Sequence, residues 1–423
     1  MSDERDGSTG DAGDAPGGDD AVGGSGDGAG QGPTEPGRGG RTPRQGPGGV
    51  QGAIEAYFRA APLTVPLYAV LLALLIGSIV IVLSGANPLT AYQALFTGIF
   101  GTPELMASAL ARSTPFVFAA LAVAICFKAG LFNIGAEGQL LLGALSGVWV
   151  GGWGMIAGWP TLFAAGAALV AGILGGAIWG FIPGLLKVRT GAHEVIVTIM
   201  LNNVAILFLE WIIGSRNPPI LIDPDATAAR TLPVVDSARL PSLFPGTGLH
   251  TGLLIAILLC AAMWYVMRNS TTGFEIRTVG ANPAAAHYAG MSVSRTTILV
   301  FIVGGGLAGL GGAAEVLGSR GGYLTPGAYT GIGFDGIAIA LIARANPFAV
   351  IPAAILWGSL LAGAPLMQVV ADLSVDIIRV IQALIILFVA ADMIVRTVFR
   401  IRAPKGVETV DEPVVHVRGW GEG

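Results

Sequence analysis

The sequence predicts an all-α polytopic membrane protein with about ten transmembrane segments, some of them broken or re-entrant, and with both termini in the cytoplasm. Of its 423 residues, 53% are hydrophobic and only 12% are charged, whereas soluble domains carry about 25% charged residues. Uncharged runs such as 65–83 and 251–267 approach the length of about 20 residues that a spanning helix needs. The alternating segments of about ten residues that form a transmembrane β-barrel do not occur.

Three regions follow from composition. Residues 1–60 are rich in Gly and Asp and lack an apolar run, so they cannot bury enough surface to offset the entropy cost of ordering and are expected to be a disordered cytoplasmic tail. Residues 61–398 form the predicted transmembrane domain. Residues 399–423 form a polar cytoplasmic tail.

The transmembrane domain divides into ten apolar segments. The eighth is too short to cross a bilayer as a straight helix, so it is expected to be broken or re-entrant and to be covered by protein. The segments lie at about 62–83, 106–127, 134–152, 159–182, 195–213, 251–267, 296–318, 331–344, 346–363 and 377–397.

The distribution of basic residues sets the predicted orientation. Ten crossings that start from a cytoplasmic N-terminus place 17 of the 23 Lys and Arg residues on the cytoplasmic side. Such an excess of Lys and Arg is the usual mark of cytoplasmic loops.

Two loops are longer than connectors need to be. The loop 214–250 is expected outside, either as a docking surface for an external partner or as an irregular cap. The loop 268–295 is expected inside and contains the run GANPAAAHYAG. There Asn282 can cap a short helix, Pro283 can occupy its first position and Gly290 can end it. Such a helix suits docking to a soluble protein, although a surface helix without a partner would have the same sequence.

Catalytic and metal-binding patterns are missing from the chain. GxxxxGK[ST], HExxH and GxSxG do not occur, so no catalytic residue and no metal site is predicted. No basic patch with interleaved aromatic residues points to nucleic acid. The glycine-rich run 304–312 lies inside an apolar segment, where small residues let helices pack closely.

Polar residues inside the apolar segments are the candidate pathway or gating residues. Such residues are costly in a bilayer and usually face protein or water, although a hydrogen bond between helices would also explain them. Asn133 and Glu137 are four residues apart, which would place them on one helix face. Arg379 is a possible partner for a carboxylate. The candidates form three clusters: Asn133, Glu137 and Gln139; Asn202 and Asn203; and Glu315 with Asp335.

Four stretches resemble a known family, the permease subunits of bacterial ABC importers for nucleosides and simple sugars. The resemblance covers about 63–399 and is closest to the branch that works with basic-membrane-protein-type binding lipoproteins. The stretches are 109–139 with FNIGAEGQ, 194–205 with EVIVTIMLNNVA, 272–318 with GANPAAAHYAG, and 333–341 with GFDGIAIAL.

The resemblance implies a multi-pass subunit of a bacterial plasma membrane that is not itself an enzyme. ATP and Mg would be bound by a separate ATP-binding cassette subunit, and no cofactor is expected in this chain. An extracytoplasmic lipoprotein would deliver the substrate, and a second homologous permease would form a heterodimer with this one. The loop that docks on the ATPase would include Gly280, Asn282, Pro283, Ala285, Ala286 and Gly290.

Nucleosides are the expected substrate. Amide side chains suit hydroxyls and base edges, and the segments lack the Arg or Lys cluster that phosphates favour. FNIGAEGQ also stands where sugar-transporting relatives more usually carry an acidic-Leu-Ser-Val-Gly motif. A simple sugar such as ribose or galactose is the alternative. An ion-coupled secondary transporter with paired carboxylates on broken helices is a further one. Glu137 is expected to have a structural or gating role without conferring specificity.

Overall fold

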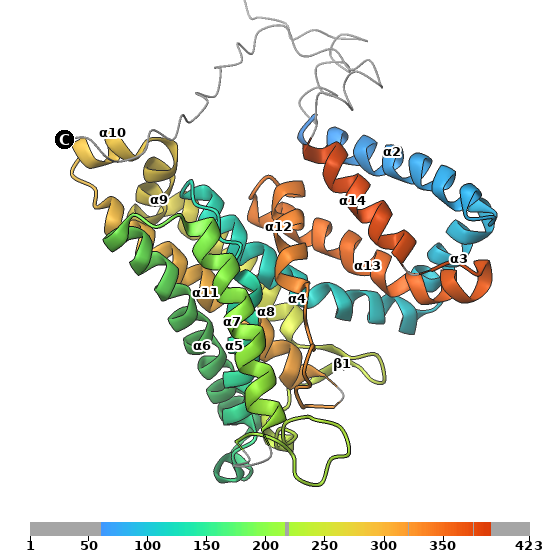
Figure 1. The fold of residues 1–423 in the computed structure, drawn as a ribbon, viewed down its shortest axis with the longest axis horizontal. Helices are drawn as coiled ribbons and strands as arrows, with labels where there is room; N and C mark the ends of the chain where they lie inside the picture. The colour runs from blue at the N-terminus through green and yellow to red at the C-terminus, as the bar shows by residue number, and fades with distance from the viewer. Residues whose placement is uncertain (1–60, 216–219, 320, 375, 391–423) are drawn as a thin grey trace, which may run out of the picture. The chain divides into compact units, whose positions relative to one another are not determined.

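The computed structural model describes residues 61–215, 220–319, 321–374 and 376–390. The chain divides into two units, residues 1–55 and 56–423, and every described residue belongs to the second. The expected terminal tails, and the end of the segment expected at 377–397, lie outside the described residues. Regular structure in the described part is almost entirely helical (Figure 1).

Three helices pack closely around shared glycines: α5 (Ala136–Gly151), α6 (Thr161–Thr190) and α11 (Val293–Gly318). A side chain at Gly176 of α6 would overlap the carbonyl oxygen of Gly305 in α11. The helix backbones are therefore in direct contact, and the prediction that the glycine-rich run of α11 serves helix packing is confirmed.

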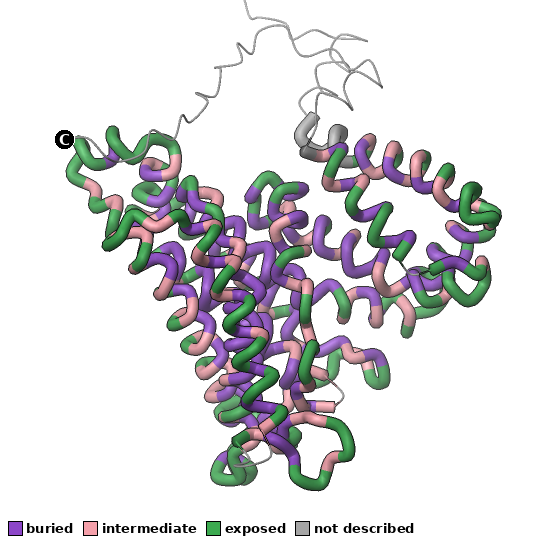
Figure 2. Tube along the Cα trace, in the orientation of Figure 1, coloured by how far each residue is buried: buried purple, intermediate pink, exposed green. Residues whose placement is uncertain are grey.

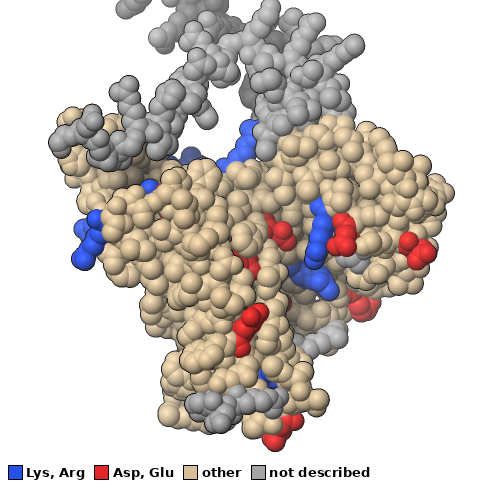
Figure 3. Space-filling model, in the orientation of Figure 1, with Lys and Arg blue, Asp and Glu red and all other residues tan. Residues whose placement is uncertain are grey.

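The outward faces of these helices are apolar. Leu174 and Ile178 of α6 are exposed on either side of the buried Gly176. Figure 2 shows buried and exposed positions along the same helices, and the described surface drawn in Figure 3 carries few charged side chains. Small residues inside and large apolar residues outside are expected of a protein that is surrounded by hydrocarbon.

A second group of helices is built on α4. Helix α4 packs against α3, α11, α12 and α13, and α14 packs against α2. The bounds are α2 (Ala61–Leu83), α3 (Pro88–Phe100), α4 (Pro103–Lys128), α12 (Ile332–Ile342), α13 (Pro347–Ala371) and α14 (Asp376–Ala390).

Helix α3 was not among the ten predicted segments. Its 13 residues are too few to span a bilayer, and Tyr92 and Gln93 interrupt its apolar character. The local start signal is nevertheless present, because Asn87 accepts a hydrogen bond from the Leu89 N–H at 2.9 Å and Pro88 occupies the first turn. These capping residues mark the start of the helix in the sequence, although its length and polarity do not.

Four α-helices of the described part remain, two of which lie within the 268–295 loop. Helix α7 (Glu194–Gly214) packs against α5, and α8 (Gly252–Asn269) leads into the loop. The loop holds two helices, α9 (Thr271–Ala281) and α10 (Pro283–Tyr288). The sequence predicts only the second of these.

Six described helices are long and apolar enough to cross a membrane: α4, α6, α7, α8, α11 and α13. Helix α12 has 11 residues, so the expectation of a short eighth segment is confirmed. It packs against α4, α5, α13 and α14, and protein therefore covers most of it, with Phe334 and Leu341 exposed. The count of ten crossings and the cytoplasmic position of the termini stay predictions.

The described part of the 214–250 loop folds back onto the helix ends. Val235 N–H donates to the Gly151 carbonyl at 2.9 Å, and Leu240 N–H donates to the Leu317 carbonyl at 3.0 Å. These contacts cap the ends of α5 and α11, as one of the two alternatives for this loop expects. Short elements within or beside the cap are η1 (Gly154–Ile156), η2 (Asp236–Ala238), β1 (Ser242–Phe244) and β2 (Leu249–His250).

The cap has its own ion pair. Arg230 donates to Asp223 at 2.9 and 3.0 Å, and its guanidinium lies 4.8 Å from the centre of the Tyr323 ring. The hydrogen bond to Asp223 raises the pKa of Arg230. The pair and the ring together fix this part of the cap over the chain that follows α11.

Candidate functional site between helices α5, α7 and α12

A non-helical link, residues 129–135, joins α4 to α5. Asn133 lies in this link, so the prediction that Asn133 and Glu137 share a helix face is wrong. Helix α5 begins only at Ala136, with Gly135 as the residue that precedes it. The Asn133 side chain instead pairs with that of Gln139 through two amide hydrogen bonds, at 2.9 and 3.1 Å. Both side chains are buried.

Glu137 lies in the first turn of α5 and is fully buried. Its carboxylate accepts hydrogen bonds from the Gly331 N–H at 2.5 Å and the Gly333 N–H at 2.7 Å. These two groups belong to the start of α12, where Gly331 has no side chain with which to cap the helix. Glu137 therefore caps α12 from another helix, and the positive end of the α12 dipole favours its charge.

The close approach of α5 and α12 depends on Gly333. A side chain at Gly333 would overlap the backbone of Glu137. The two helix starts consequently touch through their backbones, with the Glu137 carboxylate spanning the contact.

Asn202 of α7 binds the backbone at the start of α5 through two hydrogen bonds. Its side-chain oxygen accepts from the Gly138 N–H at 2.9 Å, and its nitrogen donates to the Ile134 carbonyl at 2.9 Å. Asn203 does not join this arrangement. It is exposed and donates to the Ile199 carbonyl of its own helix at 3.1 Å. The predicted Asn pair is thus divided between two faces of α7.

The third predicted cluster is also divided, because Asp335 and Glu315 have different partners. Asp335, in the first turn of α12, interacts electrostatically with Glu137, with Arg379 and with the indole of Trp357. Glu315 faces His250, with 3.8 Å between Oε2 and Nε2.

Arg379 pairs with a carboxylate, as the sequence suggested. Its closest carboxylate is that of Asp376 on the same helix, at 3.4 Å, and both side chains are three-quarters exposed. A pair in that setting contributes little to stability.

His250 is a buried polar residue that the sequence analysis did not single out. Its Nδ1 accepts from the Gly252 N–H at 3.1 Å, and its Nε2 is the ring atom on the side of Glu315. Side chains at Gly252 or Gly318 would collide with its ring. A single histidine in a loop gives no sequence signal for such packing.

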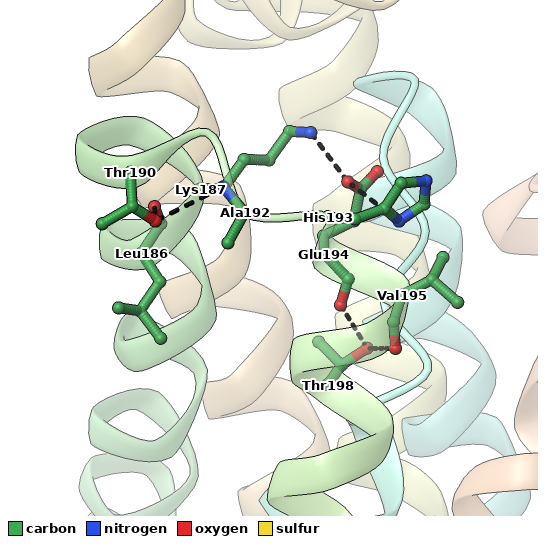
Figure 4. A network of polar contacts seen from close by, with 8 residues as sticks. All are labelled: Leu186, Lys187, Thr190, Ala192, His193, Glu194, Val195 and Thr198. Carbon is green, nitrogen blue, oxygen red and sulfur yellow. Dashed lines mark hydrogen bonds and ion pairs between the residues drawn. The ribbon is translucent and has the colours of Figure 1, made fainter. Parts of the chain in front are cut away.

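An ion pair closes the turn between α6 and α7 (Figure 4). Lys187 Nζ lies 2.7 Å from Glu194 Oε2, and His193 Nδ1 lies 4.0 Å from the same oxygen. Thr198 donates to the Glu194 carbonyl at 2.7 Å. This network fixes the start of the helix that carries Asn202 to α5. The available sequence signal was the pair of opposite charges, Lys187 and Glu194, between the apolar segments 159–182 and 195–213.

The predicted short helix in the 268–295 loop is confirmed as α10. Asn282 accepts a hydrogen bond from the Ala285 N–H at 3.0 Å, Pro283 occupies the first turn, and Gly290 has a left-handed φ of 82°. Ala285 is exposed, whereas Ala286 is fully buried.

Gly280 connects this loop to the rest of the site. A side chain there would overlap the carbonyl oxygen of Lys128, and Gly130 packs against the Gly280 backbone. The loop containing α9 and α10 therefore touches the link that leads to Asn133 and Glu137.

Among the described residues, no group of three or more His, Cys, Asp or Glu could hold a metal ion. Cys126 and Cys260 are buried and not disulfide-bonded. The site thus consists of amides, one buried carboxylate and backbone groups. Such groups hold helix ends or bind polar neutral molecules.

Residues 105–390 match the family described as branched-chain amino acid transport system / permease component. The chain is 39% identical over 353 residues to the guanosine ABC transporter permease protein NupP of Bacillus subtilis (strain 168). That match covers 82% of this chain and 99% of the relative.

Two further relatives are also named as ABC transporter permease proteins. The nucleoside ABC transporter permease protein NupB of Lactococcus lactis subsp. cremoris (strain MG1363) is 36% identical, and the match covers 78% of this chain and 91% of NupB. The glucose ABC transporter permease protein TsgB13 of Haloferax volcanii is 35% identical, and the match covers 76% of this chain and 86% of TsgB13. No solved structure matches the chain significantly.

Proposed function

This chain belongs to the branched-chain amino acid transport system / permease component family, and from that premise we propose that it is the permease subunit of an ABC importer for nucleosides. It is a multi-pass protein of the cell membrane, with six helices able to span a bilayer among its described residues. In the proposed assembly it forms the translocation pathway and is not itself an enzyme.

The observation that carries the proposal is the extent of the similarity to NupP. At 39% identity the match spans 99% of that guanosine permease, so the similarity extends over nearly its whole length and is not limited to one motif. NupB, which is named for nucleosides, supports the same substrate class. TsgB13, which is named for glucose, keeps a simple sugar such as ribose or galactose as the second candidate.

We assign ATP hydrolysis to a partner, an ATP-binding cassette subunit that binds ATP and Mg. The sequence contains no GxxxxGK[ST] loop, and α10 offers a docking helix. Its exposed face includes Ala285 and Tyr288, and the Tyr288 side chain is 91% exposed. An exposed aromatic residue on a short capped helix suits a groove on a soluble subunit.

Two further partners complete the proposed importer. An extracytoplasmic binding lipoprotein would deliver the nucleoside to the face that carries the 220–250 cap. A second homologous permease would pair with this chain as a heterodimer and close the pathway.

We propose that the polar residues between α5, α7 and α12 act mainly on the shape of the pathway. The side chains of Asn133, Gln139 and Asn202 are already hydrogen-bonded to protein groups. A nucleoside would have to displace these bonds in order to bind them. Glu137 is likewise occupied by two backbone N–H groups, which supports a structural or gating role without influence on specificity.

Uptake measurements test the proposed function. Cells with and without the gene would be given labelled guanosine, adenosine, uridine, ribose and glucose, and only nucleoside uptake is expected to fall in the deletion strain. In inverted vesicles and proteoliposomes, transport should require ATP and should persist when an ionophore collapses ion gradients. Loss of ribose or glucose uptake with intact nucleoside uptake would refute the nucleoside assignment. Dependence on an ion gradient without ATP would refute the importer.

A further inference from the structure

We propose that Glu137 is a positioning residue through which movement of the α9–α10 loop reaches helix α12. The inference rests on the proposed function, because it supposes that an ATPase moves that loop. It goes beyond that function by naming the residues that transmit the movement. The transmitting element is the link 129–135 together with Lys128 at the end of α4 and the first turn of α5. The α9–α10 loop contacts it at Lys128 and Gly130, and Glu137 lies at its other end.

The first contact lies where α9 ends. Gly280 sits so close to the Lys128 carbonyl oxygen that a side chain would overlap it, and Gly130 adopts a left-handed φ of 70° while packing on the same residue. Two backbones in direct contact have no flexible side chains between them that could rearrange to absorb a displacement. A shift of α9 must therefore move the start of the link.

The second contact lies deep in the helical layer. Asn202, which binds the start of α5, is eight residues from the start of α7, or about 12 Å along that helix. Gly336 of α12 packs on Ala119, which is nine residues before the end of α4, or about 13 Å. The link thus runs inward from the Lys128 end and delivers Glu137 to the start of α12 at this depth.

The tie between the link and α12 is short and specific. It consists of the two hydrogen bonds from Gly331 and Gly333 to the Glu137 carboxylate, at 2.5 and 2.7 Å. Charge-assisted bonds to a helix start are stronger than neutral ones. Because Glu137 is fully buried, water does not offer a ready replacement for either bond.

Helix α12 is flanked by backbone that can act as hinges. Gly327, Tyr329 and Gly331 precede it with left-handed φ values of 74°, 63° and 94°, and Arg344 and Ala345 follow it at 50° and 51°. Left-handed conformations are costly for residues other than Gly and concentrate at switch regions. A helix of 11 residues between two such segments can change its position without unfolding.

Distance measurements test this transmission in the assembled importer reconstituted with its ATPase. Spin labels would be placed on α10 (Tyr288→Cys), on α12 (Phe334→Cys) and on the cap (Leu243→Cys), all exposed positions. The native cysteines are buried and would be replaced by alanine if they label. The α10–cap and α12–cap distances would be compared with and without ATP.

In the wild-type chain both distances should change on ATP binding. In Glu137→Gln, which keeps the size of the side chain but loses its charge, the α10 distance should still change while the α12 distance stays constant. Nucleoside transported per ATP hydrolysed should fall about tenfold, as expected for loss of charge-assisted hydrogen bonds. Glu315→Gln is the matched control, because it removes a carboxylate that is also inside the helical layer, although less deeply buried, and that lies outside the transmitting element. It should preserve both distance changes.

Gly280→Ala tests the other end of the link with Glu137 intact, and it keeps the proposal testable if Glu137→Gln does not fold. The added side chain would overlap the Lys128 carbonyl oxygen and so disturb the contact between α9 and the link. The ATP-dependent change in the α12–cap distance should therefore be lost. An α12 change that persists in both variants would overturn the transmission, as would a wild-type importer that transports nucleosides while α12 stays still. A wild-type complex without ATP-dependent nucleoside uptake would instead reject the proposed function and with it the premise of the transmission.

Discussion

Two regions of this protein hold helices together in opposite ways. In the glycine bundle, formed by α5, α6 and α11, backbones touch directly at Gly176, Gly305 and Gly309. In the polar junction, formed by residues 129–139, Asn202 and the start of α12, a few directional hydrogen bonds set the positions of the helix starts. The same helix, α5, belongs to both regions, and Glu137 and Gln139 lie in its first turn.

The difference indicates where the protein resists movement and where it permits it. Interlocked backbones resist shear along their whole length, because every displacement creates an overlap. A hydrogen bond can break and re-form at modest net cost. Change of shape should therefore concentrate at the junction while the bundle stays constant. Substitutions in the two regions should differ accordingly in what they damage.

The largest effect is expected from Gly309→Leu in the bundle. A side chain there would overlap the Gly172 carbonyl oxygen and lie 2.8 Å from Gly176 Cα, and no rotamer relieves a backbone overlap. The free energy of unfolding should fall by about 3 kcal/mol, the upper end of the usual cost of overpacking. The apparent melting temperature of the purified protein in detergent measures this.

Gly166→Leu is the control for the bundle. Gly166 lies on α6 with open space around the position of a side chain, so the melting temperature should not fall. Equal losses in the two variants would show that close backbone contact is not what stabilises the bundle.

An intermediate effect is expected from Asn202→Leu in the junction. The substitution leaves the buried Gly138 N–H and Ile134 carbonyl without the partners they have now, which costs about 1–3 kcal/mol. Uptake should fall more than stability, because the start of α5 loses its position. Asn203→Leu changes the neighbouring, exposed residue and should stay within about 0.5 kcal/mol of wild type. Similar results for both variants would contradict the assigned role of Asn202.

The smallest effect on stability is expected from Ala285→Arg on the surface of α10. Ala285 is exposed, so the free energy of unfolding should change by no more than about 0.5 kcal/mol. The melting temperature should therefore stay close to that of the wild type. Uptake should nevertheless fall several-fold if α10 docks on the ATPase, whereas ATP hydrolysis by the partner persists. The contrasting variant, Ala286→Arg, places a charge at a fully buried position and should lower stability as well. Normal uptake with Ala285→Arg would show that α10 is not part of the surface that docks on the ATPase.

Local rules account for what the sequence predicted well. Composition and run length indicated the membrane class, the glycine-rich run 304–312 indicated close helix packing, and the Asn282-Pro283 pair indicated α10. Each of these depends on residues that are close together in the chain. The same rules failed for Asn133, because the spacing argument assumed a helix that begins only at Ala136, and for α3, because its length and polarity hid it from a search for spans.

The sequence by itself determined that this chain is a multi-pass helical protein, which residues carry polar groups inside it, and where small residues allow helices to touch. Only the tertiary structure decided which of those groups meet. Asn202 and Asn203 differ by about 100° around α7, and the packing of that helix selects one of them. The partners of Glu137 are backbone N–H groups 194 and 196 residues away. Every residue except proline offers such a donor, so no sequence pattern marks the ones that a buried carboxylate will find.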